Sequence, residues 1–371
     1  MISRKTALSI LKGVLTKKTP IYVQFAVTKR CDLNCRMCGI VKSWKNEKDL
    51  DLDDVERIAD ILDNLNTGVV ILTGGEPFSR NDLPEIVKIF HEKGLNTRLQ
   101  TNGTLCTEEN VKEVVKSGLD DISISLDSLN PKVQDSITNV KGSWERTINS
   151  ISLFSRMMPK RNSMPIINCV LSRKNITEIE KMAKFADKIG FSLSVIPVHL
   201  LKERSENFAF RGYESSMGFS KRDFDLIDRT YLKLIEMKRK GFSIYNSLKF
   251  LRESPEFIKY QICRWKCYSP YLYFSISPSG LFSPCIDLRT DISILDDRFL
   301  EIYSSKEFEK RISRQVSQCS GCMYGCWPEI TYLCEDVKVF IERISEGLKI
   351  LGRKRKGFDY DSIIKIINSI S

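Results

Sequence analysis

The chain has 371 residues, of which 42% are hydrophobic and 28% are charged, and its formal net charge is +11. This length and composition predict a globular, soluble protein with one large and one or two small domains. We find no run of 18 apolar residues and no signal peptide, so membrane spanning and transport are not indicated. Basic runs at residues 17–18 and 353–356 are typical of solvated faces, although an anionic membrane, a nucleic acid or an acidic partner would also attract them.

The chain contains twelve cysteines, most of them bunched in CxxxCxxC and CxxC patterns rather than spread along the sequence. Bunched cysteines favour metal ligation over disulfide bonds. We therefore expect a reducing, cytoplasmic compartment.

Residues 1–20 predict a basic amphipathic helix. Between residues 3 and 18 the apolar positions follow helical spacing and alternate with lysine and arginine, and Pro20 ends the segment. Such a helix either docks on the neighbouring domain or lies on a membrane surface, and both alternatives stay open.

From residue 21 to residue 200, short apolar segments alternate with amphipathic ones. This alternation predicts parallel βαβ units with right-handed crossovers. Six strands indicate an α/β fold, a partial (β/α)6 TIM-like barrel, followed by a small cysteine-rich domain. The expected strands are 22–28, 68–73, 96–101, 121–127, 165–171 and 191–197, and the expected helices are 52–65, 82–93, 107–117, 143–157 and 176–189.

Three cysteines follow the first expected strand, at positions 31, 35 and 38. As thiolates, Cys31, Cys35 and Cys38 can bind three irons of a 4Fe-4S cluster, which leaves the fourth iron without a protein ligand. Zinc is the competing interpretation, but it usually takes four ligands and no histidine lies near in the sequence.

Together with Met37 and Gly39, this spacing resembles the cluster motif of the radical SAM superfamily. The resemblance covers about residues 21–200. It implies that the amino and carboxylate groups of S-adenosylmethionine (SAM) bind the open iron and that reductive cleavage gives a 5′-deoxyadenosyl radical. It also implies an electron donor such as ferredoxin or flavodoxin.

The expected strands end in glycines and polar residues, where α/β barrels collect their chemistry. Thr73-Gly-Gly-Glu-Pro77 resembles the superfamily's GGEP segment, whose backbone pairs with the amino group of SAM. Glycines allow close approach of backbone to a ligand, and Glu76 can bind the ammonium or steady the loop. Polar residues after the third to fifth strands either bind SAM, as in relatives, or cap strand ends. The candidate SAM-binding residues are Met37, Gly74, Gly75, Glu76, Thr101, Asn102, Ser125, Asp127 and Asn168.

Three further residues are catalytic candidates. Cys106 and Cys169 would be hydrogen-atom donors and His199 a base. Free cysteines are more often small buried hydrophobes, and we favour a structural role for the histidine as well.

Residues 201–262 lose the alternation and are expected to bridge two modules, with a loop or lid over 203–220 and a helix over 224–240. Seven cysteines follow within residues 263–335. The pattern Cys267-x12-Gly280-x4-Cys285 with Cys319-x2-Cys322 resembles the auxiliary-cluster extension called SPASM, or its shorter twitch form, in which a glycine turns a β-hairpin.

This second resemblance implies an auxiliary 4Fe-4S cluster on Cys267, Cys285, Cys319 and Cys322. The sequence departs from the full SPASM pattern after Cys322. A second auxiliary cluster and a zinc site therefore both stay open for the remaining cysteines of the block. These are Cys263, Cys326 and Cys334.

Residues 336–371 are expected to be helical, and the run from 337 to 351 is again amphipathic and basic. A second such segment strengthens the interpretation that the protein contacts a membrane peripherally. Ordinary packing remains the alternative.

The resemblance predicts an enzyme that abstracts hydrogen from an unactivated C–H bond, followed by oxidation, cross-linking, epimerisation or another rearrangement. A peptide or protein side chain is the expected substrate, because SPASM relatives often modify peptides. The rival is a lipid or other small metabolite at the membrane surface. A remote alternative is a non-catalytic metal-cluster protein that binds nucleic acid, although we expect no nucleic-acid partner.

Overall fold

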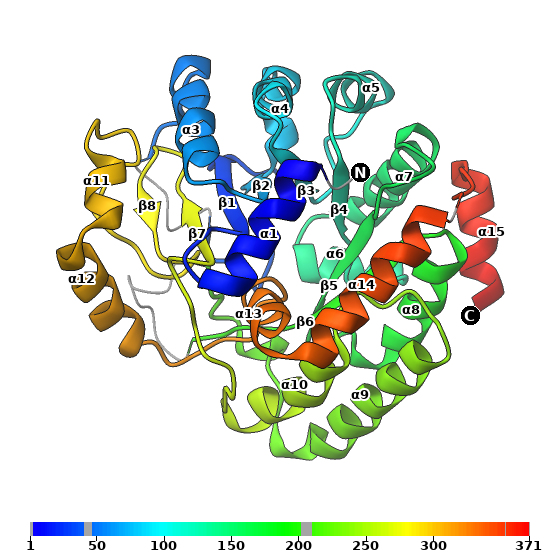
Figure 1. The fold of residues 1–371 in the computed structure, drawn as a ribbon. Helices are drawn as coiled ribbons and strands as arrows, with labels where there is room; N and C mark the ends of the chain where they lie inside the picture. Colours follow the sequence, from blue (N-terminus) through cyan, green and yellow to red (C-terminus); the bar gives the residue numbers. More distant parts are fainter. Residues whose placement is uncertain (1–2, 41–46, 202–209, 353, 371) are drawn as a thin grey trace.

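Six parallel strands in chain order form the centre of the molecule (Figure 1). The structure is a computed structural model that describes residues 3–40, 47–201, 210–352 and 354–370. Each of these strands pairs in parallel with the next one in the chain, the arrangement expected of successive βαβ units. The strands are β1 (Tyr22–Thr28), β2 (Val69–Gly74), β3 (Asn96–Thr101), β4 (Asp121–Ser125), β5 (Ile166–Leu171) and β6 (Ser192–Pro197).

Helices cover the outer face of this sheet, and the α/β partial-barrel prediction is confirmed (Figure 1). All five helices expected in this half are present, although residues 176–178 form a short 3-10 turn. They are α3 (Leu52–Asn64), α4 (Leu83–Glu92), α5 (Glu108–Lys116), α7 (Ser143–Met157) and α8 (Ile179–Lys188). The prediction missed one short helix, α6 (Pro131–Thr138), which Asn130 caps through its side chain.

The two faces of the sheet differ in polarity. Leu99 of β3 and Ile122 of β4 belong to the apolar core beneath the helices. Their neighbours Arg98, Gln100 and Ser123 point to the other face and line a cavity. Because barrel interiors are ordinarily filled by branched apolar side chains, this polar inner face indicates a binding site rather than a packed core.

The predicted hairpin extends the same sheet. It consists of β7 (Tyr273–Ile276) and β8 (Phe282–Ser283), and Gly280 turns it with a φ of 78°. Strand β7 pairs in parallel with β1, so that the sheet order is β6-β5-β4-β3-β2-β1-β7-β8. The cysteine-rich region is therefore joined to the barrel by backbone hydrogen bonds, and not only by surface contact.

The remaining helices follow in the C-terminal half of the chain. The predicted helix over 224–240 is confirmed as α9. The predicted loop or lid over 203–220 falls partly outside the described residues. The C-terminal helices are α9 (Phe224–Arg239), α10 (Leu248–Tyr260), α11 (Phe299–Ser304), α12 (Lys306–Ser317), α13 (Trp327–Glu335), α14 (Val337–Gly352) and α15 (Tyr360–Ile370).

The predicted N-terminal helix is α1 (Arg4–Thr16), and it lies with α14 on the side of the molecule facing the viewer in Figure 1. Small and polar residues of α1 face the protein, where the Thr6 hydroxyl donates to the Gly68 carbonyl. Large apolar side chains on both helices face outward instead. These are Leu8, Leu11 and Leu15 on α1 and Val337, Ile341, Ile344, Leu348 and Leu351 on α14. Among the described residues, no helix is both long and apolar enough to cross a bilayer.

Candidate active site

A cavity of about 230 Å³ opens inside the partial barrel. Its wall combines the cysteine loop after β1 with the carboxyl ends of β2 to β6. Most of the residues singled out in the sequence line it together. They are Cys31, Cys35, Met37, Cys38, Gly74, Gly75, Thr101, Asn102, Ser125, Asp127, Asn168 and His199.

We refer to Cys31, Cys35 and Cys38 as the rim cysteines. None of the three forms a disulfide. Their loop is fixed from two sides: the backbone N–H of Arg36 donates to the Ile137 carbonyl of α6, and Cys38 forms an antiparallel bridge with Arg211. Burial raises the pKa of Cys31 to about 12. A thiol that binds a metal loses its proton nevertheless, because the cation stabilises the thiolate.

The donor set fits an iron-sulfur cluster better than a single ion. In the described part of the chain, no three Cys, His, Asp or Glu side chains converge closely enough to share one metal ion. A cluster does not require such convergence, because each thiolate binds a different iron. Three free thiols on one loop that faces a cavity therefore satisfy the requirement for a cluster with one open iron.

The glycine segment lies directly against the cysteine loop. The backbone N–H groups of Gly75 and Glu76 donate to the carbonyls of Thr28 and Arg30 at 2.8 and 2.6 Å. A Cβ atom on Gly74 or Gly75 would overlap these carbonyl oxygens, and Gly74 has a φ of 137°. Only glycine therefore permits this close approach.

Glu76 steadies the rim instead of facing the cavity. The side chain is fully buried, and its carboxylate accepts bonds from the Thr101 hydroxyl at 2.6 Å, the Asn102 N–H at 2.7 Å and the Phe78 N–H at 3.0 Å. Burial raises the pKa of Glu76 to about 7, although all three donors favour the ionised form. Of the two roles that the sequence allowed, the contacts favour the support of the loop.

Asn102 connects this support to the cysteines. Its side-chain amide lies 3.8 Å from Cys31 Sγ and donates to Asp32 at 3.1 Å. The Glu76 carboxylate thus positions Asn102, and Asn102 in turn contacts the cysteine loop.

Asp127 is the buried carboxyl group on the opposite wall. It accepts a bond from the Val170 N–H at 2.7 Å, and its own N–H is held by the Gln134 side chain at 2.9 Å. Burial raises the pKa of Asp127 to about 7. Ser125 and Asn168 lie beside each other in the register of β4 and β5 and complete a polar wall.

The surroundings of the three catalytic candidates favour structural roles for them. Cys106 and Cys169 are buried in the apolar core and do not line the cavity, which argues against a role as hydrogen-atom donors. His199 lines the cavity but accepts the Met323 N–H at 2.8 Å and stacks on Tyr324. Burial and the nearby Arg211 hold the pKa of His199 well below its usual value, so the imidazole is neutral.

The four cysteines of the expected auxiliary cluster come from both sides of the hairpin and from the segment after α12, and they interact with one another. Burial is the main cause of the raised pKa values of Cys285 and Cys322, and neighbouring thiols raise them further. Cys267 raises the pKa of both, and Cys285 raises the pKa of Cys322. Cys319 acts on Cys267 in the same way. The proximity of these four is consistent with the expected ligand set.

The other three cysteines of the block are not brought together. Cys263 lies against Gly321, whereas Cys326 lines the central cavity and is contacted by the Gln24 side chain at 3.8 Å. Cys334 is at the far end of α13, and eight residues of helix separate it from Cys326 by about 12 Å. At this spacing Cys326 and Cys334 would not bind the same metal ion. A second auxiliary cluster and a zinc site both stay predictions for some of these three cysteines.

The sequence analysis missed the residues that line the deeper part of the cavity. Arg98, Gln100 and Ser123 line it from β3 and β4, and Tyr22 and Tyr245 line it nearby. The signal available was the alternation of polar and apolar residues along β3, which would have marked its inner face as polar.

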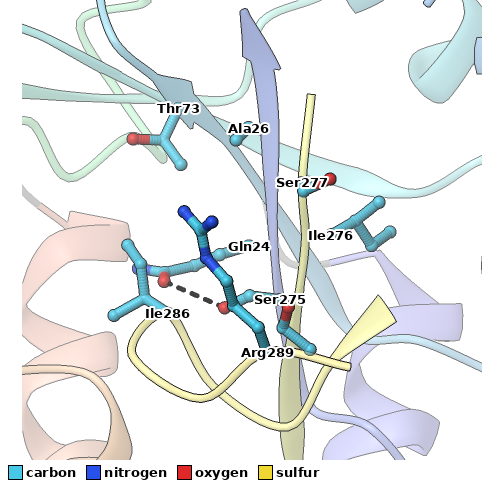
Figure 2. A pocket seen from close by; sticks show the side chains of 9 residues that line it. Gln24, Ala26, Thr73, Ser275, Ile276, Ser277, Ile286 and Arg289 are labelled. Carbon is cyan, nitrogen blue, oxygen red and sulfur yellow. Dashed lines mark hydrogen bonds between the residues drawn. The ribbon is translucent and has the colours of Figure 1, made fainter. Parts of the chain in front are cut away.

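A second, much smaller hollow of about 10 Å³ lies between β1 and the hairpin (Figure 2). Gln24, Thr73 and Ile286 line both hollows. In Figure 2, Arg289 extends from the segment after β8 toward Thr73, and the Ser275 hydroxyl donates to the Gln24 side chain at 3.4 Å. A space of this size holds about one water molecule.

Comparison with known proteins identifies the barrel. Residues 25–186 match the sequence model described as the Radical SAM superfamily. An AdoMet-dependent heme synthase of Methanosarcina barkeri is 31% identical over 46% of this chain and 48% of its own length. A probable GTP 3',8-cyclase of Thermococcus kodakarensis is 33% identical over 52% of this chain and 61% of its own length. The chain thus spans only about half of the length of these curated relatives.

A solved structure extends the likeness beyond the barrel. The structure of SuiB from Streptococcus suis bound to the precursor peptide SuiA has a TM-score of 0.60 at 19% identity, covering 82% of this chain and 70% of that chain. At this identity the likeness concerns the fold. The family match assigns residues 25–186 to the Radical SAM superfamily, and the three free rim cysteines lie within this part of the chain and line the cavity.

Proposed function

We propose that this protein cleaves SAM reductively and abstracts hydrogen from an unactivated C–H bond of a peptide or protein side chain. The observation that carries the proposal is the position of the rim cysteines, which line the cavity inside the barrel together with the polar ends of the strands. When bound, the cluster and SAM would supply the electron transfer and the 5′-deoxyadenosyl radical.

The residues of the chain would bind and orient the cluster and SAM. The rim cysteines would hold the cluster, and Glu76 and Asn102 fix the loop that carries them. The backbone at Gly74 and Gly75 would lie beside the methionine part of SAM, and Ser125, Asp127 and Asn168 offer polar groups from the opposite wall. The barrel would exclude water and other quenchers from the radical.

We further propose one auxiliary cluster, held by Cys267, Cys285, Cys319 and Cys322. All four thiols are free, and the proposal of a common site is supported by the nearby thiols that help raise the pKa of Cys267 and of Cys322. Such a cluster would accept or supply one electron after hydrogen abstraction. Because its ligands come from separate segments, metal binding would also stabilise the fold of this region.

A peptide substrate and a small metabolite differ in what they require of the cavity. The cavity of about 230 Å³ would also hold SAM and admits no folded domain, so a peptide substrate would enter it with a single side chain. The two curated relatives are named for a heme synthase and a GTP cyclase, and these names favour a small molecule as the alternative.

The exposed apolar faces of α1 and α14 favour a second proposal, peripheral contact with an anionic membrane. Together the two helices carry eight of the twelve exposed large hydrophobic side chains recorded in the described residues. Lysines and arginines flank these faces, and each one near an anionic surface contributes about 1 kcal/mol. A lipid-like substrate would be reached most easily from such a position.

The test of the proposed function is SAM cleavage. Anaerobically reconstituted protein with dithionite and SAM should release 5′-deoxyadenosine, and a Cys35→Ala variant should not. Cys106→Ala is the matched control, because this thiol is buried outside the cavity. Equal release by the wild type and Cys35→Ala would refute the assignment.

A further inference from the structure

The deepest part of the cavity contains an arginine. Arg98 is the single lysine or arginine among the described residues that line it. Its side chain is only 12% exposed, and it projects from the inner face of β3. A buried cation inside an enzyme cavity calls for an explanation, because burial of a charge is costly unless the charge is paired.

The hydrogen bonding of Arg98 is incomplete. A guanidinium has five N–H donors. In the described structure, one of them reaches the Asp121 carboxylate at 3.2 Å, and Nε is buried without a partner. Asp121 is itself shared, because its other oxygen accepts the Met164 N–H at 2.6 Å. Arg98 therefore keeps donors for another acceptor.

Two phenols complete the surroundings of Arg98. The guanidinium carbon lies 5.9 Å from the ring centroid of Tyr245, and both Tyr245 and Tyr22 interact electrostatically with the charge. Both tyrosines also line the cavity. A second arginine, Arg343, stacks on the same Tyr245 ring at 4.6 Å, but Glu329 and Glu346 pair with it at 2.7 and 2.9 Å. Arg98 and two phenol side chains thus line the same part of the cavity.

This place is remote from the rim cysteines. Arg98 precedes Asn102 by four residues, and Asn102 contacts Cys31. At about 3.3 Å per residue of extended chain, roughly 13 Å separates the two positions. The carboxylate of a SAM molecule bound at the rim would therefore not reach Arg98, and the donors remain for the other reactant.

We propose that Arg98, with Tyr22 and Tyr245, binds a carboxylate of the substrate at the foot of the barrel. The inference rests on the proposed function and names the chemical class of its substrate: an acid, either the side chain of a glutamate or aspartate in a peptide or a small carboxylic acid. The anchored carboxylate would direct the rest of the substrate toward the rim, where the radical forms.

Charge distinguishes a carboxylate from a phosphate here. Asp121 already neutralises part of the charge of Arg98. One partly paired guanidinium balances about one negative charge, whereas a phosphate dianion would require further cations, and the described lining contains no other lysine or arginine. The planar fork of arginine also matches a carboxylate in two parallel hydrogen bonds.

The test uses small fluorinated probes and the complete enzyme. Reconstituted protein saturated with SAM, without reductant, is titrated by ¹⁹F NMR with 4-fluorophenylacetate, its neutral amide and 4-fluorophenyl phosphate. Saturation with SAM keeps the carboxylate probe off the open iron. We expect the acid to bind at least tenfold more tightly than the other two probes, and Arg98→Gln to abolish this preference.

A second variant gives a change in the opposite direction. Asp121→Asn keeps an acceptor for the Met164 N–H but releases the guanidinium, so the acid should bind severalfold more tightly. Loss of folding cannot produce tighter binding. Arg57→Gln is the control for loss of a positive charge, because Arg57 is half exposed and pairs with Asp297 on the surface. Iron content and melting temperature are recorded for every variant.

Each outcome decides the inference. The inference would be overturned if the acid did not bind, if the acid and the amide bound equally, or if the phosphate bound more tightly than the acid. It would also be overturned if Arg98→Gln kept the preference for the acid. Blocked tripeptides with central glutamate or glutamine then distinguish the sources: displacement by the glutamate peptide indicates a peptide side chain, and displacement by free acids alone indicates a small acid. A wild type that prefers the acid but releases no 5′-deoxyadenosine would refute the proposed function and leave this inference standing.

Discussion

The buried ion pair between Arg211 and Asp287 connects both cysteine regions. The two side chains are 4% and 2% exposed, and Arg211 Nε lies 2.9 Å from Asp287 Oδ2. The backbone of Arg211 forms a bridge with Cys38, and its guanidinium donates to the Gly321 carbonyl at 2.9 Å. A change at this pair should therefore affect the whole fold.

The magnitude follows from the burial of the charges. Removing one partner leaves the other charge buried and costs about 3–5 kcal/mol. Unfolding entropy is about 2.1 cal/mol/K per residue, which for this chain means a fall in melting temperature of about 4–6 °C. We expect this fall for Arg211→Met and for Asp287→Asn. The double variant should lose little more than either single one, because the second change removes a charge that has already lost its ion-pair partner.

The assay is thermal unfolding of the reconstituted protein at one fixed scan rate, followed by circular dichroism. The control is Arg311→Met, which breaks an exposed ion pair with Asp291. It should shift the melting temperature by less than about 1 °C, since exposed ion pairs contribute at most about 1 kcal/mol. Single variants that melt like the control, or a double variant whose loss equals the sum of the single losses, would refute the reasoning.

Three further predictions concern clusters, membrane contact and pH. Changing all rim cysteines to alanine should leave roughly half of the iron, since one auxiliary cluster of equal size would remain, and iron near zero by chemical analysis would exclude that cluster. Changing the three exposed leucines of α1 to glutamine should reduce co-sedimentation with anionic liposomes, because each leucine contributes about 1.5–3 kcal/mol when buried. Leu232→Gln on α9 is the control. Failure of the intact protein to bind the liposomes would remove the membrane proposal. The pKa of Asp127 is raised to about 7, so this carboxyl group binds its proton more tightly in the folded state than in the unfolded state. Lowering the pH from 7 to 5 should therefore stabilise the wild type relative to Asp127→Asn by about 2–3 kcal/mol in melting experiments without SAM. A stability difference that does not change with pH would contradict this.

The sequence predicted the local elements well because they depend on local patterns. Strand β1 begins and ends where the apolar run does, and α5 begins at the cap formed by Thr107. The helix α6 also had a readable signal, a capping asparagine followed by proline at positions 130 and 131. The pairing of β7 with β1 had none, because no local pattern specifies which distant strand completes an open edge.

The site divides in the same way. The rim cysteines and the glycine segment were found from spacing, and the structure places them on one cavity. The function of Glu76 as a loop support depends on donors from three separate positions, which the sequence does not reveal. The alternation along β3 could have placed Arg98 on the inner face, but its neighbours Tyr22 and Tyr245 come from distant segments that the sequence does not bring together.

The parallel pairing of β7 with β1 bears on how the protein is synthesised. Tyr22 pairs with Tyr273, so one edge of β1 stays unpaired until about 250 further residues have been translated. At 5–20 residues per second, this interval lasts roughly 10–50 seconds. An apolar strand with an open edge is a template for pairing between nascent chains. Ribosomes that stall before residue 273 would therefore release an aggregation-prone half-barrel, and chaperones that shield the β1 edge should matter more for the yield of this enzyme than for a barrel completed in chain order.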